Sequence, residues 1–282
     1  MSYLRHLEAC NRFEPSRFLP LRLAGRRVGF VRQDNVRHLK AFPHLFGLSD
    51  QAVEIVATEG FDEVPDALIR AGAVKHRRDE RFAVTQEWGG PVLFELDRGL
   101  VEFFGVAAYA AHINGWRAGE TGPEFWIAKR AMSKLMAPGK LDNMVAGGIG
   151  SGYTAWETAV KEAGEEAGVP EDLASRTQAA GAIRYRVEMP EGMRDEVLFV
   201  YDLLVPKDFM PFNRDGEVED FRVLTAEACL RRVRETDDFM YDVNLVLIDF
   251  GIRHGLIVPD EPDYLRLVDG LRGGLVRRHR SE

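Results

Sequence analysis

The chain has 282 residues and a mass of 31.8 kDa, which is long for one domain and sufficient for two. Its 45% hydrophobic and 29% charged residues can form a buried core, so disordered and fibrous classes are excluded. The net charge of −8 argues against phosphate-driven nucleic-acid binding. Cys10 and Cys229 are too few for a disulfide framework, and no segment has the roughly 18 apolar residues of a membrane span. We therefore expect a soluble, cytoplasmic protein without a nucleic-acid or membrane partner.

The first part of the chain predicts a small α+β domain. Short strands are indicated at Val28–Val31, Val53–Ala57, Phe82–Val84 and Val92–Glu95, and helices at Pro65–Ala71 and Leu100–Ala111. Several arginines occur early in this part. We interpret them as a solvated surface, with a site for an anionic group as the alternative: Arg12, Arg17, Arg22, Arg26, Arg27, Arg32 and Arg37.

A linker is predicted at Asn114–Glu124, NGWRAGETGPE, because this segment is rich in glycine and polar residues. The chain before it is neutral, and the chain after it carries the negative charge. We therefore predict an N-terminal domain at residues 1–120 and a second domain at 121–282. In the second domain the predicted order of strands and helices indicates a mixed sheet: Phe125–Arg130, Met144–Ala146, a helix, Ala182–Glu188, Val197–Val205, Val218–Leu224 and the helix Ala226–Arg234.

The most informative segment is Gly147–Val169, GGIGSGYTAWETAVKEAGEEAGV. Within it TAWE, from Thr154 to Glu157, is a capping box that predicts a helix start, and Gly168 predicts the helix end. Three glutamates at spacing i, i+3 and i+4 share one stripe of this helix: Glu162, Glu165 and Glu166. Their mutual repulsion and their place in the C-terminal half of the helix both cost stability.

A solvated acidic face is the ordinary explanation of such a stripe, but the glycine loop GGIGSG favours another. Hard cations such as Mg²⁺ bind carboxylate and phosphate oxygens, and small residues such as Gly147 and Gly148 let a diphosphate approach closely. A dinucleotide-binding turn would need G-x-G-x-x-G, whereas this loop has G-x-G-x-G and leaves the glutamates unexplained. We interpret the segment as a metal–diphosphate site.

The same segment resembles the signature box of the Nudix hydrolases. That box is glycine, five residues, Glu, seven residues, then Arg-Glu-apolar-x-Glu-Glu-x-Gly-apolar. Gly147 matches its first glycine, and its metal-binding glutamates correspond to Glu162, Glu165 and Glu166. Tyr153 stands where the family has its first Glu, and Lys161 where it has Arg. In the family these two side chains form a mainly structural ion pair.

Longer stretches resemble a Nudix subgroup labelled thiamine pyrophosphokinase-related: WIAKRAMSKLMAPGKLDNMVAGGI, EVLFVYDLLVP and DGEVEDF. Members of that subgroup carry an extra N-terminal domain. The resemblance implies an α+β protein in which a smaller N-terminal domain precedes a Nudix α/β/α sandwich with a mixed sheet. It also implies Mg²⁺- or Mn²⁺-dependent hydrolysis of a diphosphate joined to an organic moiety X, with thiamine diphosphate or its analogues as candidates.

The resemblance also assigns roles to further residues. Glu165, Glu166 and the downstream acid Glu217 are candidates for the catalytic base, with a plain turn charge as the alternative for Glu217. Independently of the resemblance, their charge, size or place on a strand predicts that Arg130, Lys134, Gly147, Gly148 and Arg184 contact the substrate, with surface solvation as the alternative for Arg130 and Lys134.

We expect the N-terminal domain to shape substrate choice, with Phe103, Phe104 and Tyr109 close to X. A chain beginning near Gly122 should then retain metal binding and some hydrolysis. The competing hypothesis is a catalytically degenerate Nudix fold that serves as a binding or regulatory module. Tyr153 and Lys161 favour this hypothesis, and the three retained glutamates oppose it.

Overall fold

A seven-stranded mixed sheet forms the centre of the computed structural model, which describes residues 2–273. Its strand order is β11-β12-β7-β8-β13, with β10 beside β7 and β9 beside β8. β7 and β12 pair in parallel, and the other neighbours are antiparallel. The strands are β7 (Ala107–Ala118), β8 (Pro123–Arg130), β9 (Leu141–Asp142), β10 (Val145–Gly148), β11 (Gln178–Met189), β12 (Gly192–Leu204) and β13 (Val218–Thr225).

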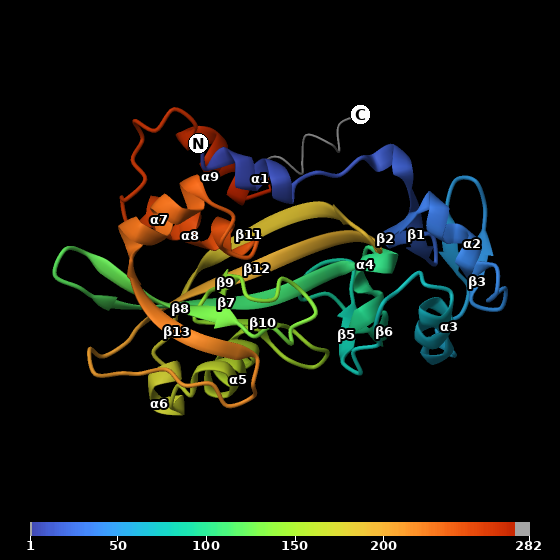
Figure 1. Cartoon of the computed structure of the whole chain (residues 1–282). Coiled ribbons are helices and arrows are strands. Elements are labelled where there is room, and N and C mark those ends of the chain that lie inside the picture. The colour runs from blue at the N-terminus through green and yellow to red at the C-terminus, as the bar shows by residue number, and fades with distance from the viewer. Residues whose placement is uncertain (1, 274–282) are drawn as a thin grey trace.

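Helices cover both faces of this sheet (Figure 1). One face packs against α5 (Ala155–Ala167) and α6 (Glu171–Ala174). The opposite face packs against α7 (Ala226–Glu235), α8 (Val243–Arg253) and α9 (Tyr264–Leu271). Each interface has its own cluster of buried apolar side chains. The predicted α/β/α sandwich with a mixed sheet is therefore confirmed.

The N-terminal helix α1 (Leu4–Cys10) belongs to the same layer as α8 and α9 (Figure 1). The ring nitrogen Nε2 of His6 lies 2.6 Å from the carbonyl oxygen of Val233, and Ser2 Oγ donates a hydrogen bond to Asp263 at 2.6 Å. Cys10 of α1 and Cys229 of α7 are both free and buried in this layer. The first residues of the chain therefore stabilise the C-terminal helices.

Residues 15–104 form the predicted small α+β unit beside the sandwich (Figure 1). A four-stranded sheet has the order β2-β1-β4-β3, and β5 pairs with β6 in a two-stranded sheet. Its apolar core is rich in phenylalanine. The elements are β1 (Phe18–Leu23), β2 (Arg26–Arg32), α2 (Val36–Leu39), β3 (Phe46–Leu48), β4 (Val53–Ile55), α3 (Val64–Arg70), β5 (Arg81–Val84), β6 (Phe94–Asp97) and α4 (Val101–Phe104), with 3₁₀ turns at Pro15–Arg17, Gln33–Asn35, Phe61–Glu63 and Arg98–Leu100.

The helix predicted at Leu100–Ala111 is wrong beyond Phe104. Gly105 ends α4 in the left-handed region at φ +51°, and a Cβ there would lie 2.6 Å from the carbonyl oxygen of Phe30. The following apolar residues belong to the central strand β7. A strand covered on both faces lacks the alternation of apolar and polar residues, so its sequence resembles that of a buried helix.

The linker predicted at Asn114–Glu124 is also wrong. β7 continues to Ala118 and β8 begins at Pro123, and the amide of Gly119 donates to the carbonyl of Gly122 at 2.9 Å in the turn between them. Glycine and polar residues mark a hairpin here, because tight turns need the same composition as linkers. A division of the chain at residues 120 and 121 stays a prediction, and it would separate β7 from its hydrogen-bonded neighbour β8.

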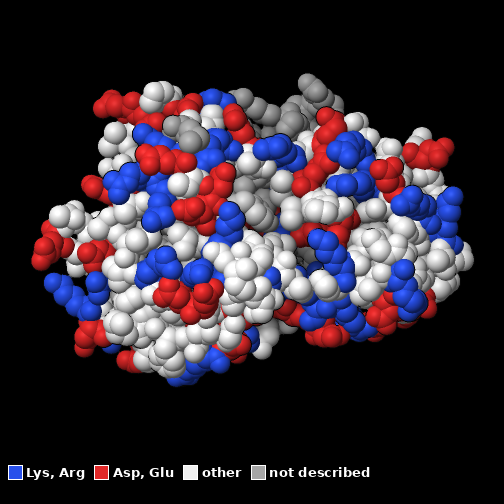
Figure 2. Space-filling view, viewed as in Figure 1, with Lys and Arg blue, Asp and Glu red and all other residues white. Residues whose placement is uncertain are grey.

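The visible surface carries mixed charge. Figure 2 shows Lys and Arg side chains interspersed with Asp and Glu over the face seen in Figure 1. Between residues 2 and 273 no helix combines the length and apolarity needed to cross a bilayer.

Candidate active site

Helix α5 begins and ends where its sequence predicts. Thr154 Oγ1 accepts a hydrogen bond from the amide of Glu157 at 3.1 Å, and the Glu157 carboxylate accepts one from the amide of Thr154 at 2.9 Å. Gly168 terminates the helix in the left-handed region at φ +61°. Both ends of the helix are thus fixed by local interactions, and its alanines pack into the core beneath β7 and β10. This packing fixes the position of the three glutamates relative to the glycine loop.

A cavity of about 900 Å³ lies at this junction. It brings together nearly all of the predicted site residues. They are Glu162, Glu165, Glu166, Glu217, Arg130, Lys134, Gly147 and Gly148. Arg184 is not brought to the cavity, because its guanidinium extends along the sheet to Asp195 at 3.2 Å. Arg184 is therefore not among the residues that can contact a substrate in this cavity.

Gly147 is needed because the glycine strand and the helix approach very closely. A Cβ atom at this position would lie 2.3 Å from Cγ of Glu162, well inside the contact distance of two carbon atoms. The Glu162 side chain therefore crosses the space that any other residue at position 147 would occupy. The signature glycine allows the carboxylate to reach the cavity.

Glu166 is the most deeply buried carboxylate of the stripe, at 7% exposed. Its Oε2 accepts a hydrogen bond from the amide of Ala146 at 2.8 Å. Burial raises the pKa of Glu166 well above its ordinary value, because a single backbone donor compensates little of the lost hydration. Burial likewise raises the pKa of Glu162 against the opposing effect of Lys161.

Lys161 interacts with the neighbouring glutamates rather than with Tyr153. Its ammonium donates to Glu162 at 3.1 Å and to Glu165 at 2.7 Å. Partial burial disfavours its charge, but the hydrogen bonds with these carboxylates raise the pKa of Lys161 above its ordinary value. Tyr153 is 51% exposed, and no interaction joins it to Lys161 within the described chain. The ion pair of the signature box is therefore absent, and the lysine balances the acidic stripe instead.

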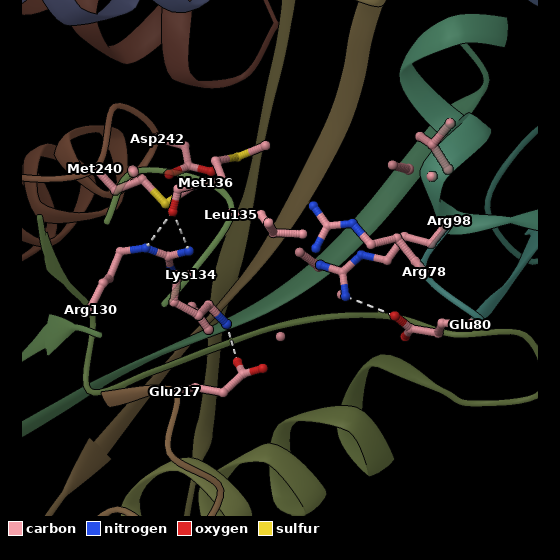
Figure 3. Close-up of a pocket in the computed structure, with 18 of the residues that line it drawn as sticks. Arg78, Glu80, Arg98, Arg130, Lys134, Leu135, Met136, Glu217, Met240 and Asp242 are labelled. Atoms are coloured by element: carbon pink, nitrogen blue, oxygen red, sulfur yellow. Dashed lines mark hydrogen bonds and ion pairs between the residues drawn. The ribbon is translucent and has the colours of Figure 1, made fainter. Parts of the chain in front are cut away.

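The loop before β13 carries Glu217 to the cavity. The amide of Arg214 donates to the carbonyl of Glu165 at 3.2 Å, which attaches this loop to the end of α5. Asn213 Oδ1 accepts from the amide of Gly216 at 2.9 Å and shapes the turn. The Glu217 carboxylate forms an ion pair with Lys134 (Figure 3).

The chemistry of these donors fits a hard divalent cation, although their present arrangement is not a closed cage. Among residues 2–273 no three His, Cys, Asp or Glu side chains are grouped as a metal site. Lys161 and Lys134 form ion pairs with three of the four carboxylates. Glu166 is the exception, because it is buried with one backbone donor and no cation. A cation bound here would compensate that charge.

Arg130 is held by neighbouring groups at the edge of the cavity. It donates to Asp142 at 2.6 Å. It also donates to the carbonyl of Met136 at 2.9 and 3.2 Å (Figure 3). These bonds use most of its donors, so the guanidinium stabilises the loop after β8. Arg130 still lines the cavity.

The cavity also includes residues that the sequence analysis missed. The side chains of Arg78 and Arg98 reach it from the N-terminal part of the chain (Figure 3). Arg98 donates to Glu80 at 2.8 Å, and its Cζ would lie 3.3 Å from a Cβ at Gly148. An arginine thus covers the glycine strand from outside the signature box. No local sequence pattern marks it, because the contact exists only in the folded chain.

The aromatic residues expected near X lie elsewhere. Phe103 and Phe104 are fully buried in the core of the N-terminal unit, and Tyr109 packs against Trp88 and Phe199. The arginine cluster before residue 40 also does not line the cavity. The interpretation of that cluster as an anion site therefore gains no support.

Comparison with known proteins agrees with the geometry. The NUDIX domain model matches residues 110–242, and a domain of unknown function (DUF4743) matches residues 2–108. Nudix hydrolase 24, chloroplastic, of Arabidopsis thaliana is 34% identical over 96% of this chain and 78% of its own length. The chain belongs to the Nudix hydrolase family. Nudix hydrolase 20, chloroplastic, of the same plant is 32% identical over 96% of this chain and 77% of that relative.

Among solved structures, DR0079 from Deinococcus radiodurans covers 60% of this Nudix hydrolase at a TM-score of 0.46 and 20% identity, and 98% of its own chain is covered. Nudix hydrolases cleave pyrophosphate bonds and generally use divalent metal ions. This chain is accordingly a Nudix pyrophosphohydrolase with an additional N-terminal domain.

Proposed function

We propose that this Nudix hydrolase cleaves a diphosphate joined to an organic moiety X and that Glu162, Glu165 and Glu166 hold Mg²⁺ or Mn²⁺. The observation that carries the proposal is the buried carboxylate of Glu166 beside the glycine strand. A buried negative charge with one backbone donor is costly unless a cation compensates it. Family membership supports the reaction, and the donor chemistry supports the metal.

The cation, when bound, neutralises the diphosphate and lowers the pKa of a coordinated water. The residues of this chain then have separate tasks. Gly147 leaves room for the Glu162 side chain beside β10, and Gly148 lies against Phe82 and Arg98 at the cavity wall. Lys134 and Arg98 lie at the cavity wall and can bind phosphate oxygens by charge-assisted hydrogen bonds. A carboxylate among Glu165, Glu166 and Glu217 accepts the proton of the attacking water.

For X we propose thiamine diphosphate or an altered analogue of it as the first candidates. The support is the likeness of three stretches to the thiamine pyrophosphokinase-related subgroup: residues 126–149, 196–206 and 215–221. The size of the cavity, about 900 Å³, is compatible with a ring system attached to a diphosphate.

A hydrolysis screen tests the proposal. Purified full-length protein is incubated with a panel of diphosphate compounds and Mg²⁺ or Mn²⁺, and product phosphate is measured. We expect metal-dependent turnover that a chelator abolishes and that either cation restores. Turnover that is unchanged by the chelator would refute the metal assignment, and the absence of turnover across the panel would refute the reaction.

A further inference from the structure

The glycine loop before α5 is hydrogen-bonded on both sides. On one side the amide of Ile149 donates to the carbonyl of Tyr109, in the central strand β7, at 2.8 Å. On the other side the amide of Ser151 donates to the carbonyl of Arg81, the first residue of β5, at 2.7 Å. The Ser151 hydroxyl also donates to the carboxylate of Glu95 in β6, the strand that pairs with β5. The β5–β6 pair of the N-terminal unit is therefore bonded to a loop of the signature box.

Phe82 brings the same pair of strands into contact with β10. Its side chain is buried, and it lines the cavity. A Cβ at Gly148 would lie 2.8 Å from Cζ of Phe82, which is closer than Cβ atoms approach other atoms in proteins. Any other residue at position 148 would therefore displace the ring or the strand. The absence of a side chain at Gly148 allows Phe82 to pack directly on the β10 backbone.

Arg98 is held by the same part of the chain. Its Cζ lies 5.4 Å from the centroid of the Phe82 ring, a cation–π contact. Its amide donates to the carbonyl of Glu80 at 2.8 Å, and its guanidinium donates to the Glu80 carboxylate at 2.8 Å (Figure 3). Glu80 directly precedes β5. A shift of the β5–β6 pair would therefore move Arg98 and the glycine loop together.

The position of the glycine loop affects the acidic stripe of α5. The loop continues into Thr154, the N-cap of α5, and its first residue Gly147 leaves space for the Glu162 side chain. A displacement of the loop is thus passed to a carboxylate of the site. In enzymes a displacement of about 1 Å at the reacting groups can lower the rate by about 10²-fold. Contacts made outside the signature box can therefore control turnover.

We propose that the β5–β6 pair positions the glycine loop for catalysis and that Phe82 is the positioning residue. Phe82 acts through Gly148 and Arg98 and takes no part in bond cleavage. The N-terminal unit thereby contributes to the geometry of the catalytic site itself. This inference rests on the proposed diphosphate hydrolysis, in which Arg98 binds phosphate oxygens.

The test replaces two phenylalanines of one apolar core in the full-length protein. Phe82→Leu keeps an apolar side chain but removes Cζ and the aromatic face. Phe94→Leu is the matched control, because Phe94 is 8% exposed against 6% for Phe82, belongs to the same core and strand pair, and lies outside the cavity. Both changes should lower the melting temperature by a similar amount. A merely structural role of Phe82 would therefore give the two variants equal kinetics.

The kinetic probe is thiamine diphosphate with Mg²⁺. Phe82→Leu should lower kcat/KM by about 10-fold, and Phe94→Leu should stay within about threefold of the natural protein. Gly148→Ala should also cost about 10-fold, but less than about threefold in the Phe82→Leu background, because leucine has no Cζ for the added Cβ to meet. Equal losses in the two phenylalanine variants, or a Gly148→Ala loss that is the same in both backgrounds, would overturn the inference.

Hydrogen exchange of the backbone amides at residues 147–153 needs no substrate. We expect faster exchange of this loop in Phe82→Leu than in the natural protein or in Phe94→Leu. Unchanged exchange in Phe82→Leu would overturn the inference while the hydrolase assignment stands. If the natural protein hydrolyses neither thiamine diphosphate nor any other diphosphate compound, the proposed function is refuted, and the exchange measurement alone shows whether Phe82 holds the loop.

Discussion

The position of Glu166 affects both the stability of the fold and the chemistry of the site. It lies in the apolar layer under β10, where a carboxylate without a cation is disfavoured. Glu162 and Glu165 lie on the same stripe but are balanced by Lys161. This arrangement of carboxylates is unfavourable for folding, and it is explained if the glutamates bind a cation that in turn binds a diphosphate.

Replacing Glu165 or Glu166 with Gln should lower turnover by at least about 10²-fold, because each change removes one negative charge while retaining shape. Helix content measured by circular dichroism should stay unchanged. Glu227→Gln, at an exposed position in the first turn of α7, is the control and should retain turnover. Near-normal activity of both helix variants would contradict the assigned role.

Tyr153 and Lys161 distinguish an active enzyme from a degenerate binding module. The double change Tyr153→Glu with Lys161→Arg restores the residue types of the signature box. Arginine can also contact the glutamates, so we expect turnover within about threefold of the natural protein. The measurement is kcat on one diphosphate substrate for both proteins. Activity that appears only in the double variant would instead identify the natural chain as a decayed enzyme.

The contact between β10 and α5 decides whether the glutamate stripe reaches the cavity. Gly147 and Glu162 share one small space, and the capping box fixes the helix that carries Glu162. The two elements therefore act as one unit. The addition of a single methyl group at this contact should therefore lower the turnover of the enzyme.

Gly147→Ala should lower turnover by about 10-fold or more, because its Cβ would lie 2.3 Å from Cγ of Glu162 and displace that side chain. Gly164→Ala is the matched control. Gly164 is helical, with its nearest atom 3.9 Å from the added Cβ, so this change should raise stability by about 0.5–1 kcal/mol and leave turnover unaltered. Kinetics and thermal unfolding of both variants provide the check. Equal turnover of the Gly147→Ala and Gly164→Ala variants would show that the close approach of Gly147 and Glu162 is not needed for the reaction.

The cavity depends on parts of the chain that are far apart in sequence. Arg78 and Arg98 reach it from the N-terminal part, and α1 packs on the C-terminal helices. A chain beginning near Gly122 would also lack β7, which pairs with β12, β10 and β8. The expectation that such a truncation keeps the site is therefore wrong, because it removes the centre of the sheet. The role of the N-terminal part has to be tested in the full chain.

Arg98→Ala should raise KM for a diphosphate substrate by about 10-fold with kcat changed by less than about threefold. The guanidinium lies beside Gly148 at the cavity wall, where it would bind phosphate oxygens of the substrate, but it is partly exposed to solvent, which weakens its contribution. Arg26→Ala, which removes an exposed arginine outside the cavity, is the control. Steady-state kinetics of both variants against the natural protein decide the result. An unchanged KM in Arg98→Ala would exclude the N-terminal wall from substrate binding.

The amino-acid sequence by itself determined the features that local interactions control. The capping box and Gly168 define α5, and the spacing of Glu162, Glu165 and Glu166 defines the acidic stripe. Hydrogen bonds between near neighbours suffice for both, so they are visible in the sequence. The glycine loop beside this stripe indicated a metal–diphosphate site, and the family likeness added hydrolysis as the reaction and the Nudix fold.

Only the tertiary structure decided where distant residues meet. The apolar residues after Gly105 form the central strand β7, and side chains on both faces of this strand pack against the helix layers, which removes any periodic pattern. Arg98 and Asp242 have no local signature, and their place at the cavity follows from the packing of the N-terminal unit and α8 against the same sheet. The spacing of residues in the sequence specifies which side chains share one face of a helix or strand. The contacts between different helices and strands depend on the whole fold.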